Sequence, residues 1–159
     1  MAKKLWEKDT TVNPEIERFT VGLDRELDLL LARYDVLGSI AHSTMLQSIG
    51  MLTREEMTSL HSELRNIYGT IEAGEFTIEE GVEDVHSQVE LMLTRKLGDT
   101  GKKIHSGRSR NDQVLVDLKL FTRNELKGVC RRVKELFDAL IEQSERHKEV
   151  LMPGYKHLQ

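Results

Sequence analysis

The feature that most constrains the fold is one long amphipathic helix, predicted from Ser109 to about Val150. Its start, Ser109-Arg-Asn-Asp112, has a capping-box pattern, and the helical pattern then continues unbroken to Pro153-Gly154. At about 1.5 Å per residue this helix would measure roughly 55–60 Å, which is longer than any core that the preceding residues could form. Its apolar stripe therefore needs long partner helices, either later in the chain or in other subunits. The stripe comprises Val114, Leu118, Phe121, Leu126, Val129, Val133, Phe137 and Leu140.

Three shorter helices are predicted upstream. The capping box Thr53-Arg-Glu-Glu56 begins one helix, which Ala73-Gly74 ends. Asp84 is a favourable N-cap for the next, which Gly98 ends. Over residues 24–49 the apolar residues fall at steps of three and four, which predicts one continuous helix. Its apolar face would carry Leu27, Leu30, Leu31, Tyr34, Leu37, Ala41, Met45 and Ile49.

These patterns predict an all-α fold in two parts. The chain has only two prolines and few clusters of β-branched residues, which favours helix over strand. We expect residues 1–104 to form a small helical N-terminal domain. Residues 105–159 are expected to begin a central bundle of long helices.

Composition excludes several classes of partner. The 23 Lys and Arg residues against 27 Asp and Glu residues make the chain mildly acidic, whereas a general nucleic-acid binder carries a basic excess. Cys130 is the only cysteine, so an internal disulfide is impossible. The chain has neither the apolar segment of a signal peptide nor the run of roughly 20 apolar residues that a membrane span needs. We expect a cytoplasmic protein that binds neither membrane nor nucleic acid.

The residues with the richest chemistry lie at the start of the long helix, in Ile104-His-Ser-Gly-Arg-Ser-Arg-Asn-Asp-Gln-Val114. Gly107 lets the backbone approach a ligand closely. Arg108 and Arg110 offer forks for carboxylates, and the free N–H groups of a helix N-terminus favour anions. The pattern fits a site for a small polyanion. A simple helix cap with two solvated arginines fits the spacing about equally well.

Three segments resemble one known family. His105-Ser-Gly-Arg-Ser-Arg-Asn-Asp-Gln-Val114 resembles the first signature of argininosuccinate lyases, within the fumarase/aspartase superfamily. Glu83-Asp-Val-His-Ser87 resembles the Asp-x-His motif that precedes this signature. Gly154-Tyr-Lys-His-Leu-Gln159 resembles the family's Gly-Tyr-Thr-His-Leu-Gln motif. The resemblance covers essentially the whole chain and about the first third of a full-length member, and it implies an L-aspartase/fumarase-like fold.

The resemblance also implies a reaction, the reversible elimination of argininosuccinate to fumarate and L-arginine in arginine biosynthesis. No metal or organic cofactor is expected. A base removes a proton from the carbon next to a carboxylate, and an acid assists departure of the guanidino nitrogen. The aci-carboxylate dianion that forms between these steps must be stabilised by cations and N–H donors already in place.

Individual roles follow from the matched positions. Asn111 matches a substrate-binding asparagine, and Ser109 and Arg110 match residues that line the carboxylate site, with Arg108 beside them as a further substrate contact. His86 matches the histidine of the Asp-x-His motif, near the substrate. From its position alone, His86 could equally be bonded to its own helix cap.

Lys156 and Gly22 depart from the family pattern, whereas His157 fits it. His157 matches a histidine assigned to proton transfer, as a helper of a catalytic serine, although by position alone it is a loop histidine. Lys156 stands where threonine is usual, and it could contact a substrate carboxylate or point away. Gly22 lies where many members have a serine that touches substrate.

The family's mobile loop, which carries the catalytic serine, lies downstream of the segments matched here. Family members are homotetramers whose active sites are each assembled from three subunits. We therefore expect this chain to bind substrate weakly and to be inactive alone. Two alternatives stay open, a non-catalytic structural or assembly module of the same fold, and a related lyase acting on another succinyl compound.

Overall fold

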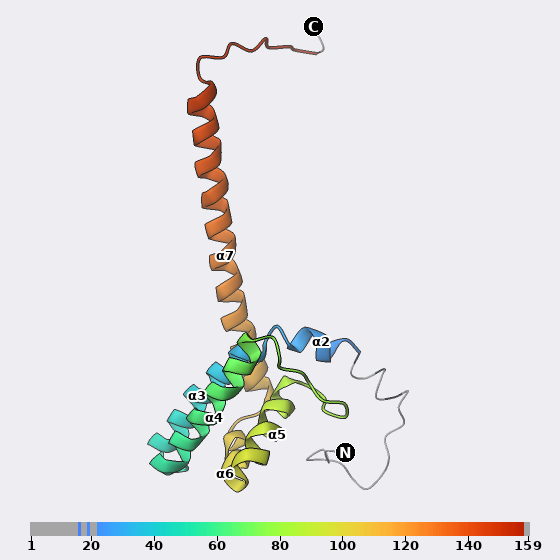
Figure 1. The fold of residues 1–159 in the computed structure, drawn as a ribbon, viewed down its shortest axis with the longest axis vertical. Helices are drawn as coiled ribbons and strands as arrows, with labels where there is room; N and C mark the ends of the chain where they lie inside the picture. The colour runs from blue at the N-terminus through green and yellow to red at the C-terminus, as the bar shows by residue number, and fades with distance from the viewer. Residues whose placement is uncertain (1–15, 17–18, 20–21, 158–159) are drawn as a thin grey trace. The chain divides into compact units, whose positions relative to one another are not determined.

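Every regular element among the described residues is a helix, which confirms the all-α fold. The computed structural model describes Ile16, Phe19 and residues 22–157. It forms two compact units, residues 1–121 and residues 122–159, and the predicted domain boundary after residue 104 stays a prediction. Across the described part of the chain, no helix combines the length and the apolar character that a membrane span requires. The helices are α2 (Asp24–Asp28), α3 (Ala32–Ser48), α4 (Arg54–Glu72), α5 (Val85–Leu97), α6 (Asp99–Lys102), the 3-10 turn η1 (Lys103–His105) and α7 (Arg110–His147) (Figure 1).

The hydrophobic core lies among α3, α4 and α5, in the first unit. Helix α4 packs along α3 and also contacts α5, and α6 packs against α5 (Figure 1). Apolar side chains from α3, α4 and α5 meet in one cluster, which Ile104 closes from η1. Its fully buried members include Val36, Leu46, Leu60, Leu64, Ile67, Val85, Val89 and Leu93.

The ends of α4 follow the sequence prediction. The Thr53 hydroxyl accepts from the Glu56 N–H, and the Glu56 carboxylate accepts from the Thr53 N–H, so the predicted capping box is present. Beyond the helix, Gly74 has a φ of 73° and donates to the Ile71 carbonyl, while the Glu75 N–H donates to the Thr70 carbonyl. This is a Schellman ending, in which a glycine takes the left-handed conformation.

The single helix predicted over residues 24–49 is wrong, because the chain breaks between α2 and α3. From Leu29 to Ala32 the backbone bonds tighten to the three-residue spacing, for example from the Leu31 N–H to the Asp28 carbonyl at 2.8 Å. The preceding helix is held by the loop before α5. Arg25 Nε donates to the Val82 carbonyl at 2.8 Å, and Asp28 accepts from the Val85 N–H. These tertiary contacts redirect the chain.

The apolar face predicted for this segment is also largely wrong. Leu27, Leu30, Leu37, Met45 and Ile49 are all at least 41% exposed. The face that α3 buries is instead partly polar. It carries Asp35, Ser39 and Ser43 at four-residue spacing, beside the apolar Ala32, Tyr34, Val36 and Leu46.

The predicted N-cap of α5 is present, because the Asp84 carboxylate accepts from the Ser87 N–H at 2.8 Å. Gly98 ends the helix, as the sequence predicted. The polar stretch after it forms α6 and η1. Gly101 allows this compact path, because a Cβ built there would lie 2.5 Å from the Leu93 backbone.

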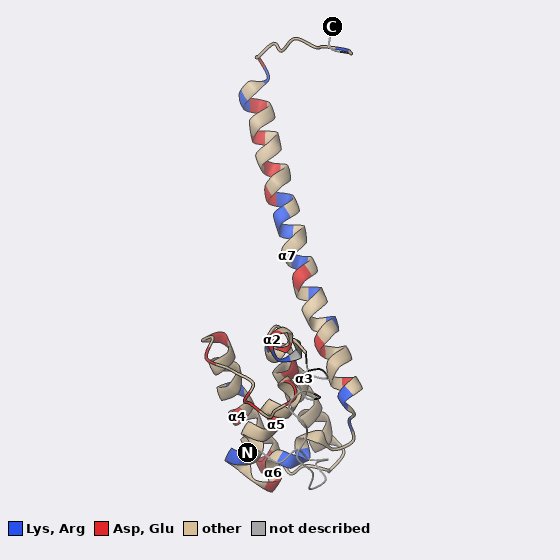
Figure 2. Ribbon diagram, turned by 90° about the vertical axis from the view of Figure 1, so that its right-hand side faces the viewer, with Lys and Arg blue, Asp and Glu red and all other residues tan. Residues whose placement is uncertain are grey.

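Helix α7 begins as predicted and ends at His147, a few residues before the predicted end. Lys and Arg alternate with Asp and Glu along it (Figure 2). Several form pairs four residues apart, such as Lys134–Asp138 and Arg146–Glu142, which support an isolated helix. The predicted stripe stays open in the second unit, where Leu126, Val129, Val133, Phe137 and Leu140 are 49–61% exposed.

The close contact at Gly101 gives a stability prediction. We expect Gly101→Ala to lower the free energy of unfolding by about 1–3 kcal/mol, because the α5 backbone would have to move. Gly69→Ala is the matched control, since Gly69 lies within α4 with open space around its Cα. It should raise stability by about 0.5–1 kcal/mol through helix propensity. Chemical denaturation followed by circular dichroism measures both, and equal effects would contradict the proposed contact.

Candidate functional site

The signature segment is fixed by the first unit as it enters α7. Ile104 is 3% exposed in the core, and Gly107 turns the chain with a φ of 66°. His42 Nε2 on α3 donates to the Ser106 carbonyl at 2.9 Å, and burial lowers the pKa of His42, which favours this neutral form. The backbone before Gly107 is thus anchored to the first unit at Ile104 and at Ser106.

Ser109 caps α7 through its partnership with Asp112. The Ser109 N–H donates to the Asp112 carboxylate at 2.8 Å, and the Asp112 N–H donates back to the Ser109 hydroxyl at 3.4 Å. Hydrogen bonds from Ser109 hold the pKa of Asp112 below its usual value. Asn111 lies beside this cap and its side chain is exposed. The structure therefore gives Ser109 a capping role and leaves Asn111 facing solvent.

Arg110 joins the two motifs, through a bond to Ser87 that spans 23 positions of the sequence. Its guanidinium lies 2.8 Å from the Asp84 carboxylate and donates to the Ser87 hydroxyl, also at 2.8 Å. Glu83 lies 3.6 Å from the same guanidinium. The side chain of Arg110 is still 41% exposed. A ligand carboxylate could therefore reach it without breaking the link to α5.

Arg108 turns inward instead of towards solvent. It donates to the Ser39 hydroxyl at 3.1 Å, and its buried Nε has no hydrogen-bond partner. Burial lowers the pKa of Arg108, although carboxylates on the neighbouring helices oppose this. An arginine stays charged in either case. Arg108 therefore brings a positive charge beneath the start of α7, facing Asp35, Asp117 and Glu90.

His86 is 5% exposed and bonds to α3, not to its own cap. Its Nδ1 lies 2.8 Å from Asp35 and 3.7 Å from Asp117, both of which are 1% exposed. Burial works against the charged imidazole, but the hydrogen bond to Asp35 and the charges of Asp35, Asp84 and Asp117 outweigh it and raise the pKa of His86. His86, which was predicted to meet substrate, therefore uses its Nδ1 for a bond within the protein.

Three of these buried polar residues were not predicted from the sequence. Burial, with the charge of Asp35, raises the pKa of Asp117 to about 7, against the opposing charges of His86 and Arg108. Gln113 is 6% exposed and its amide donates to Asp35 at 3.3 Å. A signal was present in the four-residue spacings Asp35–Ser39 and Gln113–Asp117. The apolar pattern of these helices does not include them.

Asp35, His86 and Asp117 bring three potential metal ligands within 4.8 Å of one another. A divalent ion bound there would have to displace the hydrogen bond between His86 Nδ1 and Asp35. It would also face the Arg108 guanidinium, which already supplies positive charge to both carboxylates. The side chains are of types that bind metal ions, but the existing hydrogen bond and the Arg108 charge favour protons on these groups over a bound metal ion.

The remaining predicted positions are Lys156, His157 and Gly22. Lys156 and His157 belong to the second unit, which is described by itself, and both are exposed. His157 has a φ of 53°, uncommon for a residue with a side chain. Gly22 is exposed in the first unit, also with a φ of 53°.

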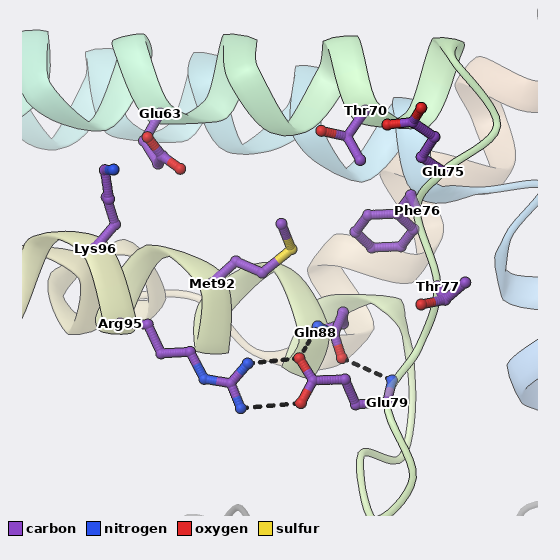
Figure 3. A pocket seen from close by; sticks show the side chains of 10 residues that line it. All are labelled: Glu63, Thr70, Glu75, Phe76, Thr77, Glu79, Gln88, Met92, Arg95 and Lys96. Carbon is purple, nitrogen blue, oxygen red and sulfur yellow. Dashed lines mark hydrogen bonds and ion pairs between the residues drawn. The ribbon is translucent and has the colours of Figure 1, made fainter.

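A hollow of about 380 Å³ lies between α4 and α5, and none of the predicted site residues lines it (Figure 3). At one side Arg95 and Gln88 both bind Glu79, with Arg95 donating to both carboxylate oxygens (Figure 3). Gln88 also accepts from the Glu79 N–H at 3.0 Å. These bonds fasten the loop before α5, so they serve the fold.

Comparison with known proteins agrees with the two motifs that meet at α7. The chain is 70% identical over 159 residues to the argininosuccinate lyase of Bacteroides fragilis, covering 100% of this chain and 36% of that protein. It is 45% identical over 157 residues to that of Thermotoga neapolitana, covering 99% and 39%, and 44% identical over 159 residues to that of Methylococcus capsulatus, covering 99% and 34%. The chain thus spans little more than a third of these curated relatives. A family model described as Lyase matches residues 2–159, and the chain belongs to that lyase family.

Proposed function

We propose that this chain forms part of an argininosuccinate lyase, which cleaves argininosuccinate reversibly to fumarate and L-arginine in arginine biosynthesis. The observation that carries the proposal is the junction at Arg110, where the Asp-x-His motif and the signature meet at the N-terminus of α7. The named function of the relatives supports the substrate.

The groups at this junction suit the charge that develops during such an elimination. Removing a proton next to a carboxylate leaves an aci-carboxylate dianion, which needs cations and N–H donors already in position. Asn111 and the exposed part of Arg110 would meet the substrate, with the start of α7 contributing its dipole. Arg108 would add positive charge from beneath, and Ser109 would hold the helix start in place.

The remaining predicted groups belong to the second unit. We propose that His157 assists proton transfer beside a serine supplied by another segment of the whole enzyme. Lys156 would add a cation for a substrate carboxylate. Both side chains are exposed, so both are available for such contacts.

The whole enzyme is proposed to be a cytoplasmic homotetramer that works without a cofactor. Support for assembly comes from α7, whose apolar side chains are half exposed over its second part. A stripe of this kind needs partner helices to leave water. The same observation supports the second candidate, a purely structural module that uses α7 to assemble.

A mixing experiment tests the proposal and separates the two candidates. Fumarate release from argininosuccinate would be measured with this chain, with the remaining part of a homologous lyase, and with both together. We expect activity only in the mixture, because the proposed site needs groups from both pieces. Association without fumarate would favour the structural module. Release of fumarate only from adenylosuccinate or aspartate would contradict the proposed substrate.

Asn111→Ala should lower kcat/KM in the active mixture by about 10²–10³-fold, because a polar contact to developing charge is lost. Asn66→Ala is the matched control, since Asn66 is an exposed asparagine on α4, outside the proposed site. Its activity should be unchanged. Steady-state kinetics measures both variants, with circular dichroism to check folding. Equal activity of the two variants would remove Asn111 from the substrate site.

A further inference from the structure

We infer that Asp35 is a positioning residue for His86 and sets which nitrogen of its ring can meet a ligand. The inference builds on the proposed function but starts from geometry alone. Asp35 on α3 and His86 on α5 are 1% and 5% exposed, and their side chains lie 2.8 Å apart. Their hydrogen bond joins Asp35 Oδ1 to His86 Nδ1.

Asp35 is itself held in place. The Gln113 amide donates to the same oxygen, Oδ1, at 3.3 Å, from the second turn of α7. The carboxylate therefore receives hydrogen bonds from two helices at once. A carboxylate held in this way has little freedom to rotate, so it fixes the plane of the imidazole that it binds.

The bond decides where His86 carries its proton. A carboxylate only accepts hydrogen bonds, so Nδ1 must carry the hydrogen in both the neutral and the charged ring. In the neutral ring Nε2 is then an acceptor, and in the charged ring it is a second donor. Asp35 thereby assigns Nε2 as the atom that can meet a ligand or a proton.

The charges around His86, Asp35 and Asp117 favour proton binding within this buried group. Asp117 lies 3.7 Å from His86 Nδ1, and its buried Oδ2 has no hydrogen-bond partner. Burial and the charge of Asp35 raise the pKa of Asp117 to about 7, so this carboxyl holds a proton more readily than an exposed aspartate does. The groups that face His86 are Asp35 from α3, Asp84 at the start of α5 and Asp117 from α7. Those that face Asp117 are Asp35, His86, Arg108 and Asp28.

The position of His86 matters to the proposed site through its neighbours in the chain. Asp84 and Ser87, on either side of it, are the residues that hold Arg110. A ring anchored to Asp35 keeps this turn of α5 against the start of α7. Loss of the anchor would disturb both the histidine and the arginine.

The first test needs no variant. Heteronuclear NMR of the nitrogen-labelled chain reports the tautomer and the titration of His86. We expect the neutral ring to carry its hydrogen on Nδ1, with a pKa above that of an ordinary histidine. A neutral ring protonated on Nε2 would overturn the inference, whether or not the chain belongs to an active enzyme.

Asp35→Asn should lower the pKa of His86 and remove the preference for hydrogen on Nδ1, because an amide can turn its NH₂ group towards the ring. Asp117→Asn should keep that preference, since it leaves the bond to Asp35 intact. Asp99→Asn, at a side chain that is 91% exposed, is the surface control and should change neither. An unchanged tautomer in a folded Asp35→Asn chain would contradict the inference. If that variant does not fold, Gln113→Ala provides the same test through a weakened hold on Asp35.

Activity in the mixture provides a separate readout. We expect Asp35→Asn to lower kcat by about 10–100-fold with a smaller effect on KM, and Asp35→Glu to recover part of it. The pH profile of kcat should shift with the pKa of His86. If the tautomer changes while kcat and its pH profile do not, Asp35 positions a histidine that the reaction does not use. An inactive wild-type mixture would count against the proposed function alone, since the NMR result stands independently.

Stability against pH tests the proton on Asp117. Its pKa rises from 3.8 to about 7 on folding, so the folded state binds a proton that the unfolded state has released. This contribution is complete below pH 3.8 and is lost as pH rises through about 7, and the raised pKa of His86 acts in the same direction. We expect denaturant midpoints to fall across this window and to fall less in Asp117→Asn. If the denaturant midpoint falls equally with pH in both chains, the proton taken up on folding is not on Asp117.

Discussion

The buried hydrogen bond between His86 and Asp35 joins α5 to α3 beneath the start of α7. Several polar side chains of the proposed site are arranged around it. Gln113 approaches from α7 and Arg108 from the signature loop, while Asp84 and Ser87 flank the histidine and hold Arg110. The two motifs that carry the family resemblance thus meet through side chains that the motifs themselves contain, and both bond to Asp35 of α3, which lies outside them.

Stability alone does not explain this cluster of buried polar side chains. Removing one partner of a buried charged pair costs about 3–5 kcal/mol, yet replacing the whole group by apolar residues is often neutral or favourable. The cluster also leaves Asp35 Oδ2, Asp117 Oδ2, Gln113 Oε1 and Arg108 Nε buried without hydrogen bonds. A fold optimised only for stability would fill this position with aliphatic side chains. A site that must hold an arginine and a histidine at fixed positions has a reason to keep it.

The sequence predicted the local features of the fold well. Both capping boxes, the N-cap at Asp84 and the glycine endings depend on residues three or four positions apart, so their chemistry can be recognised without tertiary information. The break before α3 could not be predicted in this way. Contacts of Arg25 and Asp28 with residues 57 positions away redirect the chain there.

The buried face of α3 also could not be predicted from local sequence patterns. Its exposed leucines follow the helical period as well as its buried residues do, and periodicity alone cannot say which face meets the rest of the chain. The buried polar spacing Asp35–Ser39–Ser43 carried the information about the site. In the site itself, the roles of the motif residues were predicted from the family resemblance, whereas three-dimensional contacts established the roles of Asp35, Gln113 and Asp117.

The two parts of α7 obey different physical constraints. Its first turns are ordered by the first unit, through the Ser109 cap, buried Gln113 and Asp117, and the ring contact of Phe121 with Tyr34 at 6.0 Å. Its later turns depend on intrahelical bonds and charge pairs, each pair contributing only about 0.2–0.5 kcal/mol. Burying one of their large apolar side chains would contribute about 1.5–3 kcal/mol, so partner helices would stabilise this part far more than its charges do. The proposed anion site is therefore built at the end of α7 that this chain can order by its own contacts, and the end that assembly would order carries the apolar stripe.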